Sequence, residues 1–161
     1  MSVDYIVSSL PVLAFDQPAP LTWAKFVEAC GGDEKVPRPR TWADLETQLR
    51  NAVAEARGGE RYKRPAEGCS LYWKNRVLAC FQEKDVARRD ELLDRVWWDA
   101  AGELTALASP LGRGALATYA VRLGIALRRT RISREKGNEA FDRLTAETKR
   151  SPENLETEKE A

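Results

Sequence analysis

The fold is decided by residues 85–131, which read DVARRDELLDRVWWDAAGELTALASPLGRGALATYAVRLGIALRRTR. Apolar side chains recur at helical spacing in the first half, at Leu93, Trp97, Ala100, Leu104 and Leu107. The second half repeats this spacing at Leu116, Ala120, Leu123 and Leu127. Between the two halves, Pro110 disfavours helical geometry at the residue before it. The pattern therefore predicts a hairpin of two long helices, the first of which runs up to Pro110.

Shorter helices are expected on both sides of this hairpin. Thr22 and Thr41 are good N-caps for two helices that end at the glycine pairs 31–32 and 58–59. Residues 71–81 fit a short helix, and Asp85 can cap the first helix of the hairpin. After the hairpin, Ser133 can cap a last helix whose expected buried residues are Gly137, Ala140, Phe141 and Leu144. Residues 3–10 suit either a helix or an extended segment.

No stretch alternates as a strand would, so the sequence predicts an all-α fold. We expect five to six helices in a single compact bundle built on the long helical hairpin. Residues 1–150 form one domain in this interpretation, and the polar, glutamate-rich residues 151–161 form a disordered acidic tail. The longest apolar run, residues 115–127, contains Arg122, so no membrane span is predicted.

Composition argues against most kinds of catalysis. The 161 residues include no histidine, the usual general base near neutral pH and the commonest metal ligand. The chain also lacks the glycine-rich motifs that hold phosphate groups. Its three cysteines have no metal-ligand spacing, and we expect them to be small buried thiols of a cytosolic protein. The sequence therefore predicts a protein that is not an enzyme and that needs no cofactor or metal.

Two pairs of carboxylates are possible exceptions to a protein without catalysis or metal. The pairs Asp90 with Asp94, and Asp99 with Glu103, are each one helical turn apart and could hold a metal or act as acid and base. A solvated helix face is the simpler interpretation of these carboxylates. Histidine is absent, and no glycine-rich pocket accompanies them.

The candidate partner-binding residues are one tryptophan and a group of arginines. Trp98 lies about 100° around the helix from Trp97, so it is either covered by another helix or exposed as an aromatic anchor. The basic candidates are Arg122, Arg128, Arg129, Arg131 and Arg134. Arginines of this kind bind an acidic protein surface or, as an alternative, the phosphates of a nucleic acid. Few aromatic residues accompany them, which makes nucleic acid the less favoured partner.

Three stretches, taken together, resemble a bacterial family of uncharacterised proteins encoded among the genes of V/A-type ATPases. The first is YIVSSLPVLAF, residues 5–15, followed by a proline-rich connector. The second is Trp42 with residues 49–51 and 54–57. The third is residues 92–95 with Trp98, followed by residues 119–123 and 135–141. Their order covers most of residues 4–145.

The resemblance implies an accessory or structural subunit of the rotary ATPase that acts by protein–protein docking. One role compatible with it is that of the all-helical C (or d) subunit, which seats the central shaft on the membrane ring. The implied partners are other ATPase subunits, with no direct insertion into the membrane and no small-molecule ligand. We accordingly expect a cytoplasmic protein, whose place at the membrane, if any, is peripheral and through the ATPase.

Overall fold

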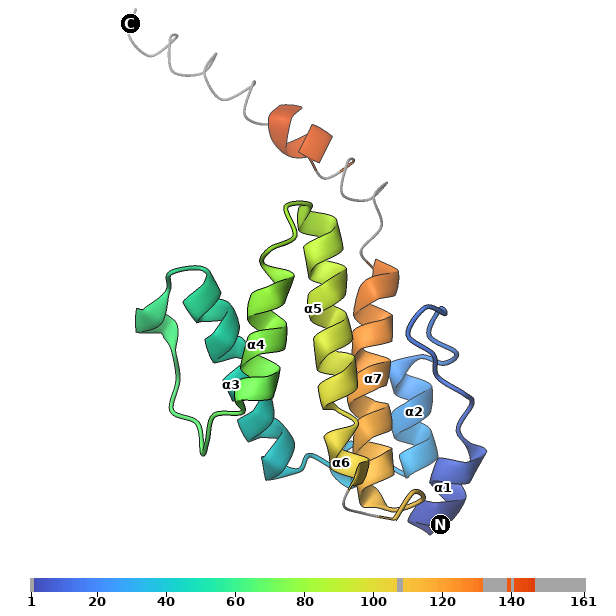
Figure 1. Ribbon diagram of the computed structural model, residues 1–161. Coiled ribbons are helices and arrows are strands. Elements are labelled where there is room, and N and C mark those ends of the chain that lie inside the picture. The colour runs from blue at the N-terminus through green and yellow to red at the C-terminus, as the bar shows by residue number, and fades with distance from the viewer. Residues whose placement is uncertain (1, 107–108, 132–138, 140, 147–161) are drawn as a thin grey trace, which may run out of the picture. The chain divides into compact units, whose positions relative to one another are not determined.

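The computed structural model describes residues 2–106, 109–131, 139 and 141–146. Residues 3–131 contain seven α-helices and two short 3-10 helices, residues 141–146 are also helical, and no strand occurs among the described residues, so the all-α prediction is confirmed (Figure 1). By its internal contacts the chain divides into two units, Met1–Leu127 and Arg128–Ala161. Each unit is described by itself below.

The helices follow one another along the chain with short connections. Their bounds are α1 Val3–Ser9, α2 Trp23–Cys30, η1 Asp33–Lys35, α3 Arg40–Ala56, η2 Glu60–Tyr62, α4 Leu71–Cys80, α5 Val86–Ala100, α6 Glu103–Ala106 and α7 Arg113–Arg131. Residues 3–9, for which the sequence left two possibilities, are helical. None of the described helices has the length and apolar character needed to cross a membrane.

Local chemistry fixes several of these helix ends as predicted. The Thr22 hydroxyl accepts from the Lys25 amide, and the Asp85 carboxylate accepts from the Arg88 amide at 2.9 Å. Each of these bonds satisfies an amide proton that the first helical turn leaves without a partner. Gly31 ends α2 in the left-handed conformation, at φ 83°, where a side chain would be strained.

The predicted cap at Thr41 is wrong, because α3 begins two residues earlier than such a cap requires. Pro39 occupies the cap position, and Arg40 is already helical. Proline fixes φ and has no N–H to leave unsatisfied, so it suits the start of a helix. Thr41 lies within the first turn.

The first helix of the hairpin is shorter than predicted. It ends at Ala100 in a turn through Ala101 and Gly102, and α6 follows as a separate short helix. A Cβ at Gly102 would lie 2.9 Å from the Asp99 carbonyl oxygen and 3.3 Å from the Arg122 guanidinium. The chain therefore bends at Gly102, where the missing side chain leaves room for Arg122 of α7. Glycine's low helix propensity was the signal in the sequence.

Two hydrophobic clusters form the core of the first unit. One is built from α3, α4 and α5, with the residues Leu45, Leu49, Ala52, Trp73, Val77, Cys80, Leu93, Val96 and Ala100. The other joins α1, α2 and α7, with the residues Ile6, Phe26, Cys30, Val36, Leu116, Ala120 and Leu123. Of the two long helices in residues 85–131, α5 thus contributes to one cluster and α7 to the other.

A third, smaller cluster lies between α5 and α7. It contains Phe15, Trp98, Ile125 and Ala126, and Trp97 packs against its margin. Beside it the Thr118 hydroxyl donates to the Ala101 carbonyl at 2.8 Å, which ties α7 to the turn that ends α5. These contacts join the two larger clusters into one folded unit.

Three burial predictions are wrong. Phe141 and Leu144 were expected in a buried helix face but are 66% and 58% exposed. Cys69 is exposed, whereas Cys30 and Cys80 are buried as expected. Cys69 follows Gly68, whose φ of 154° belongs to a loop and not to a packed helix. The proposed cap Ser133, the residues Gly137 and Ala140, and the acidic tail lie outside the described residues.

The packing of α3 gives a direct test of this core. Leu49 is fully buried, so Leu49→Ala should lower the free energy of unfolding by about 2–5 kcal/mol through lost burial and a residual cavity. Val12 is 92% exposed, so Val12→Ala should leave it within about 0.5 kcal/mol. Urea unfolding monitored by tryptophan fluorescence measures both. Equal stability of the two variants would contradict the assigned core.

Candidate functional site

Trp98, which the sequence left either covered by another helix or exposed as an aromatic anchor, is covered and belongs to the core. Its exposed fraction is 6%, and Phe15 packs edge-on against it with ring centroids 5.4 Å apart. Trp97, expected to be the buried one of the pair, is only partly buried. Helical spacing within α5 could not decide between them, because the choice depends on Phe15 and α7, which cover Trp98.

Arg122 also faces inward, toward the same tryptophan. Its Nε donates to the Trp98 carbonyl at 3.1 Å, and its guanidinium carbon lies 5.2 Å from the centre of the Trp98 ring. Burial lowers the pKa of Arg122, although the negative charge of Asp99 opposes this shift. An arginine held in this way stabilises the interior of the unit, so it is not a docking cation.

The remaining arginines of the predicted cluster lie beyond the first unit. Arg128, Arg129 and Arg131 occupy the last turn of α7 and belong to the second unit. Positive charge there is favoured by the negative end of the helix dipole. Arg134 lies outside the described residues.

The carboxylates of α5 and α6 have structural partners. Asp99 pairs with Arg76 at 2.8 Å, and Glu103 accepts from the indole N–H of Trp73. Burial alone would lower the pKa of Arg76, but Asp99 and Tyr72 outweigh it and raise that pKa. Asp94 is buried, with an exposed fraction of 6%, so the prediction of a fully solvated carboxylate face is wrong at this position. Within the described part of the chain, no group of three potential metal ligands comes together.

The most organised polar surface is the connection between α3 and α4, residues 57–70, held against one face of α3. The Asn51 side chain donates to the Arg64 carbonyl at 2.7 Å and accepts from the Arg64 amide at 2.8 Å. It thereby bonds to both backbone groups of Arg64, as a neighbouring strand would. One turn earlier, Gln48 accepts from the Ser70 amide at 2.8 Å, and Asp44 accepts from the Glu67 amide. Three side chains of α3 therefore fix the path of the connection.

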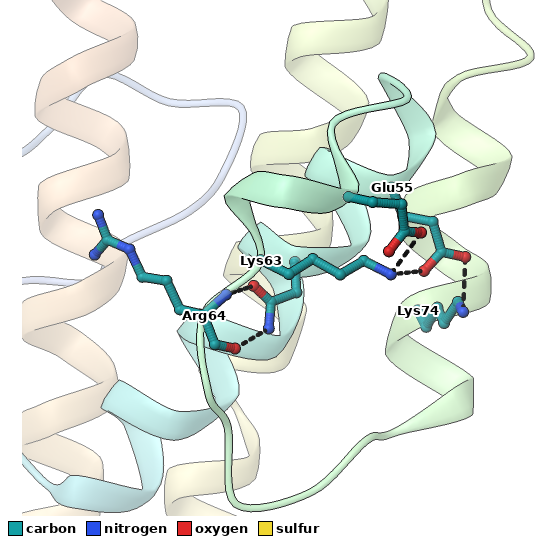
Figure 2. Close-up of polar contacts among 6 residues, drawn as sticks. Glu55, Lys63, Arg64 and Lys74 are labelled. Carbon is teal, nitrogen blue, oxygen red and sulfur yellow. Dashed lines mark hydrogen bonds and ion pairs between the residues drawn. The ribbon is translucent and has the colours of Figure 1, made fainter.

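A charged contact reinforces the same attachment. Figure 2 shows Lys63 from the connection and Lys74 from α4 converging on Glu55 of α3, with N–O distances of 2.7 Å to each. Hydrogen bonds from Lys63 and then Lys74 lower the pKa of Glu55. Glu55 and then Glu60 raise the pKa of Lys63 in return. The Arg64 side chain points away from this network (Figure 2).

Two open pockets border the connection, of about 980 Å³ and about 250 Å³. Their walls share Gln48, Cys69 and Ser70. Gln48 and Ser70 are bonded to each other, and the charged side chains in the walls are already bonded within the fold, such as Arg40 to Glu67. The pockets therefore lie beside a loop that is bonded to α3, and charged side chains in their walls take part in that bonding.

Three arginines at the outer side of the connection are presented to solvent: Arg57, Arg61 and Arg64 are all exposed. The sequence reasoning did not select them, although residues 61–84 carry six basic side chains against two acidic ones. That excess of basic residues was the sequence signal for Arg61 and Arg64. The longer arginine series in α7 was the more conspicuous one.

No family model, curated protein or solved structure matches this chain.

The bonds from Asn51 should control how tightly the connection is held. Asn51→Ala removes both bonds to Arg64, so trypsin should cleave the native protein after Arg61 or Lys63 several-fold faster. Thr47→Ala, which removes only a bond within α3 to the Ala43 carbonyl, should leave the cleavage rate unchanged. Mass spectrometry of the first cleavage products measures this. Equal cleavage of both variants would show that Asn51 does not hold the connection.

The Glu55 contact should appear in the pH dependence of stability. A lowered carboxyl pKa stabilises the fold above the ordinary value of 4.5, and this contribution is lost as the pH falls through the folded-state value. Glu55→Gln should therefore destabilise the protein at pH 7, and the difference from wild type should shrink below about pH 4.5. Thermal unfolding across this range measures it, with Glu46→Gln as the control because Glu46 pairs with Arg50 alone. A difference between Glu55→Gln and wild type that stays constant with pH would contradict the assignment.

Proposed function

We propose that this protein is a non-catalytic accessory subunit of a bacterial V/A-type ATPase and acts by docking onto other subunits. Two things support the proposal. One is the resemblance of the three sequence stretches, and the other is a helical unit whose charged side chains either bond within the fold or lie at its surface. A role like that of the C (or d) subunit is the more specific form of the same proposal.

The observation that carries the proposal is that the first and third stretches pack against each other. Phe15 from the first contacts Trp98 from the third, and the Tyr119 hydroxyl donates to the Pro11 carbonyl at 3.1 Å. Arg95 from the third lies over the Phe15 ring, 3.8 Å from its centre. Sequence segments far apart along the chain therefore build one structural element. The resemblance of the first and third stretches therefore falls on residues that contact each other in the fold.

The second stretch supports docking in another way. It contains Asn51, which holds the connection 57–70, and Arg57, which begins it. A surface that is ordered before it meets a partner loses less conformational entropy on binding. The fold thus presents a fixed charged surface, as docking by a subunit requires.

Nucleic-acid binding through the arginine series of α7 is the less supported alternative. Arg122 is bonded to the Trp98 carbonyl and is half-buried, so it cannot contribute to a phosphate-binding row. No specific contact among the described residues favours this alternative.

Co-purification tests the proposed function. The tagged full chain, expressed from its own gene locus in its native host, should retain V/A-type ATPase subunits through affinity purification of gently solubilised membranes. Mass spectrometry identifies the subunits, and a tagged cytosolic protein of similar charge serves as the control. Recovery of the chain without ATPase subunits from both soluble and membrane fractions would overturn the proposal.

A further inference from the structure

A basic cluster lies where α3 ends and α5 begins. Arg57 caps the end of α3, and Arg89 lies in the first turn of α5. Both guanidinium groups lie against Phe81, at the end of α4, with distances of 5.9 and 5.2 Å to the centre of its ring. Two arginines from different helices therefore lie on one aromatic side chain.

Arg61 extends this cluster across the Gly58-Gly59 turn. Its guanidinium lies 4.8 Å from the centre of the Tyr62 ring and donates to the Tyr62 hydroxyl at 2.8 Å. The tyrosine in turn packs over Gly59, where an added Cβ would come within 3.0 Å of the ring. Arg61 is therefore held at the surface by Tyr62, four residues after Arg57 in the chain. We call Arg57, Arg61 and Arg89 the basic cluster.

The basic cluster differs from its neighbours in lacking a carboxylate. Nearby arginines of the same helices are paired, since Arg50 binds Glu46 and Arg88 binds Glu91. Within the part of the chain that the structure describes, no ion pair involves a member of the basic cluster. Arg89 also lies at the positive end of the α5 dipole, where a cation is unfavourable. Gathering like charges in this way costs stability, and an anion would relieve that cost.

We propose that the basic cluster is a docking site for an acidic segment of a protein partner. This inference depends on the proposed function, since it names the surface through which docking occurs. Carboxylates of the partner would bind the guanidinium groups of Arg57 and Arg89, whose planar donor pairs match a carboxylate's two oxygens. Arg61 would contribute a further contact at the edge of the site.

The aromatic side chains favour a protein over a nucleic acid as the partner. Single-stranded nucleic acids need open ring faces on which bases can stack. The Phe81 ring has two guanidinium groups against it, and the Tyr62 ring lies between Gly59 and Arg61. A duplex would need a longer row of cations than these three. Charge complementarity without base stacking is what an acidic peptide segment offers.

A peptide titration tests the inference directly. A fluorescently labelled glutamate-rich peptide should bind the full chain, with an affinity that falls as salt is added. The double variant Arg57→Glu/Arg89→Glu should weaken this binding on the order of tenfold or more. The control Lys25→Glu/Lys35→Glu makes the same change in net charge on and just after α2 and should bind as wild type does. Circular dichroism and thermal unfolding check that all three proteins are folded.

Unchanged peptide affinity in the folded double variant would overturn the inference. So would equal weakening by the control variant, which would show a dependence on net charge alone. Tighter binding of a single-stranded oligonucleotide than of the peptide, lost in the same double variant, would assign the basic cluster to nucleic acid instead.

Repeating the co-purification with these variants separates the inference from the proposed function. Loss of ATPase subunits from Arg57→Glu/Arg89→Glu, with retention by Lys25→Glu/Lys35→Glu, supports both. Retention by both variants upholds the proposed function but rejects the basic cluster as the docking site. Absence of ATPase subunits even from wild type rejects the proposed function, and the peptide titration then decides whether the cluster binds acidic segments at all.

Discussion

The first unit depends on the contact of Trp98 with Arg122. Two core clusters form on different sets of helices, and the pair of helices α5 and α7 must be held together for the clusters to belong to one unit. Arg122 helps to hold α5 and α7 together, because its Nε donates to the Trp98 carbonyl and its guanidinium lies against the Trp98 ring. Inserting an arginine there is costly, because burial disfavours its charge. The fold offsets that cost with a backbone oxygen, an aromatic ring and the nearby charge of Asp99. Gly102 completes the arrangement by leaving room for the guanidinium.

Features encoded within a few residues were predictable from the sequence. The caps at Thr22 and Asp85, the end of α2 at Gly31 and the helix over residues 71–80 all follow from neighbouring side chains and backbone preferences. Features that depend on distant segments were not. Which of Trp97 and Trp98 is buried depends on Phe15, some eighty residues earlier in the chain. The break at Gly102 could have been anticipated from propensity alone, but a continuous apolar stripe through Leu104 obscured it.

The candidate site was less predictable than the fold, and for the same reason. A run of arginines in the sequence does not show which of them bind within the fold, as Arg122 does at the Trp98 carbonyl. The basic cluster, by contrast, takes Arg57 from α3 and Arg89 from α5, and only the packing of α4 between these helices brings them to Phe81. Charge counts along the chain could point to residues 61–84 as basic. They could not identify which cations lack a carboxylate partner, because pairing is a property of the folded unit.

The bonding of Asn51 to Arg64 has a consequence for the mechanics of the surface. It is the attachment nearest the middle of residues 57–70, between the Lys63–Glu55 ion pair and the bonds to Glu67 and Ser70. Pinning Arg64 to α3 divides this segment into two short loops, each with far fewer accessible states. The turn that carries Arg57 and Arg61 is therefore bounded by the end of α3 on one side and by the attachment of Arg64 on the other.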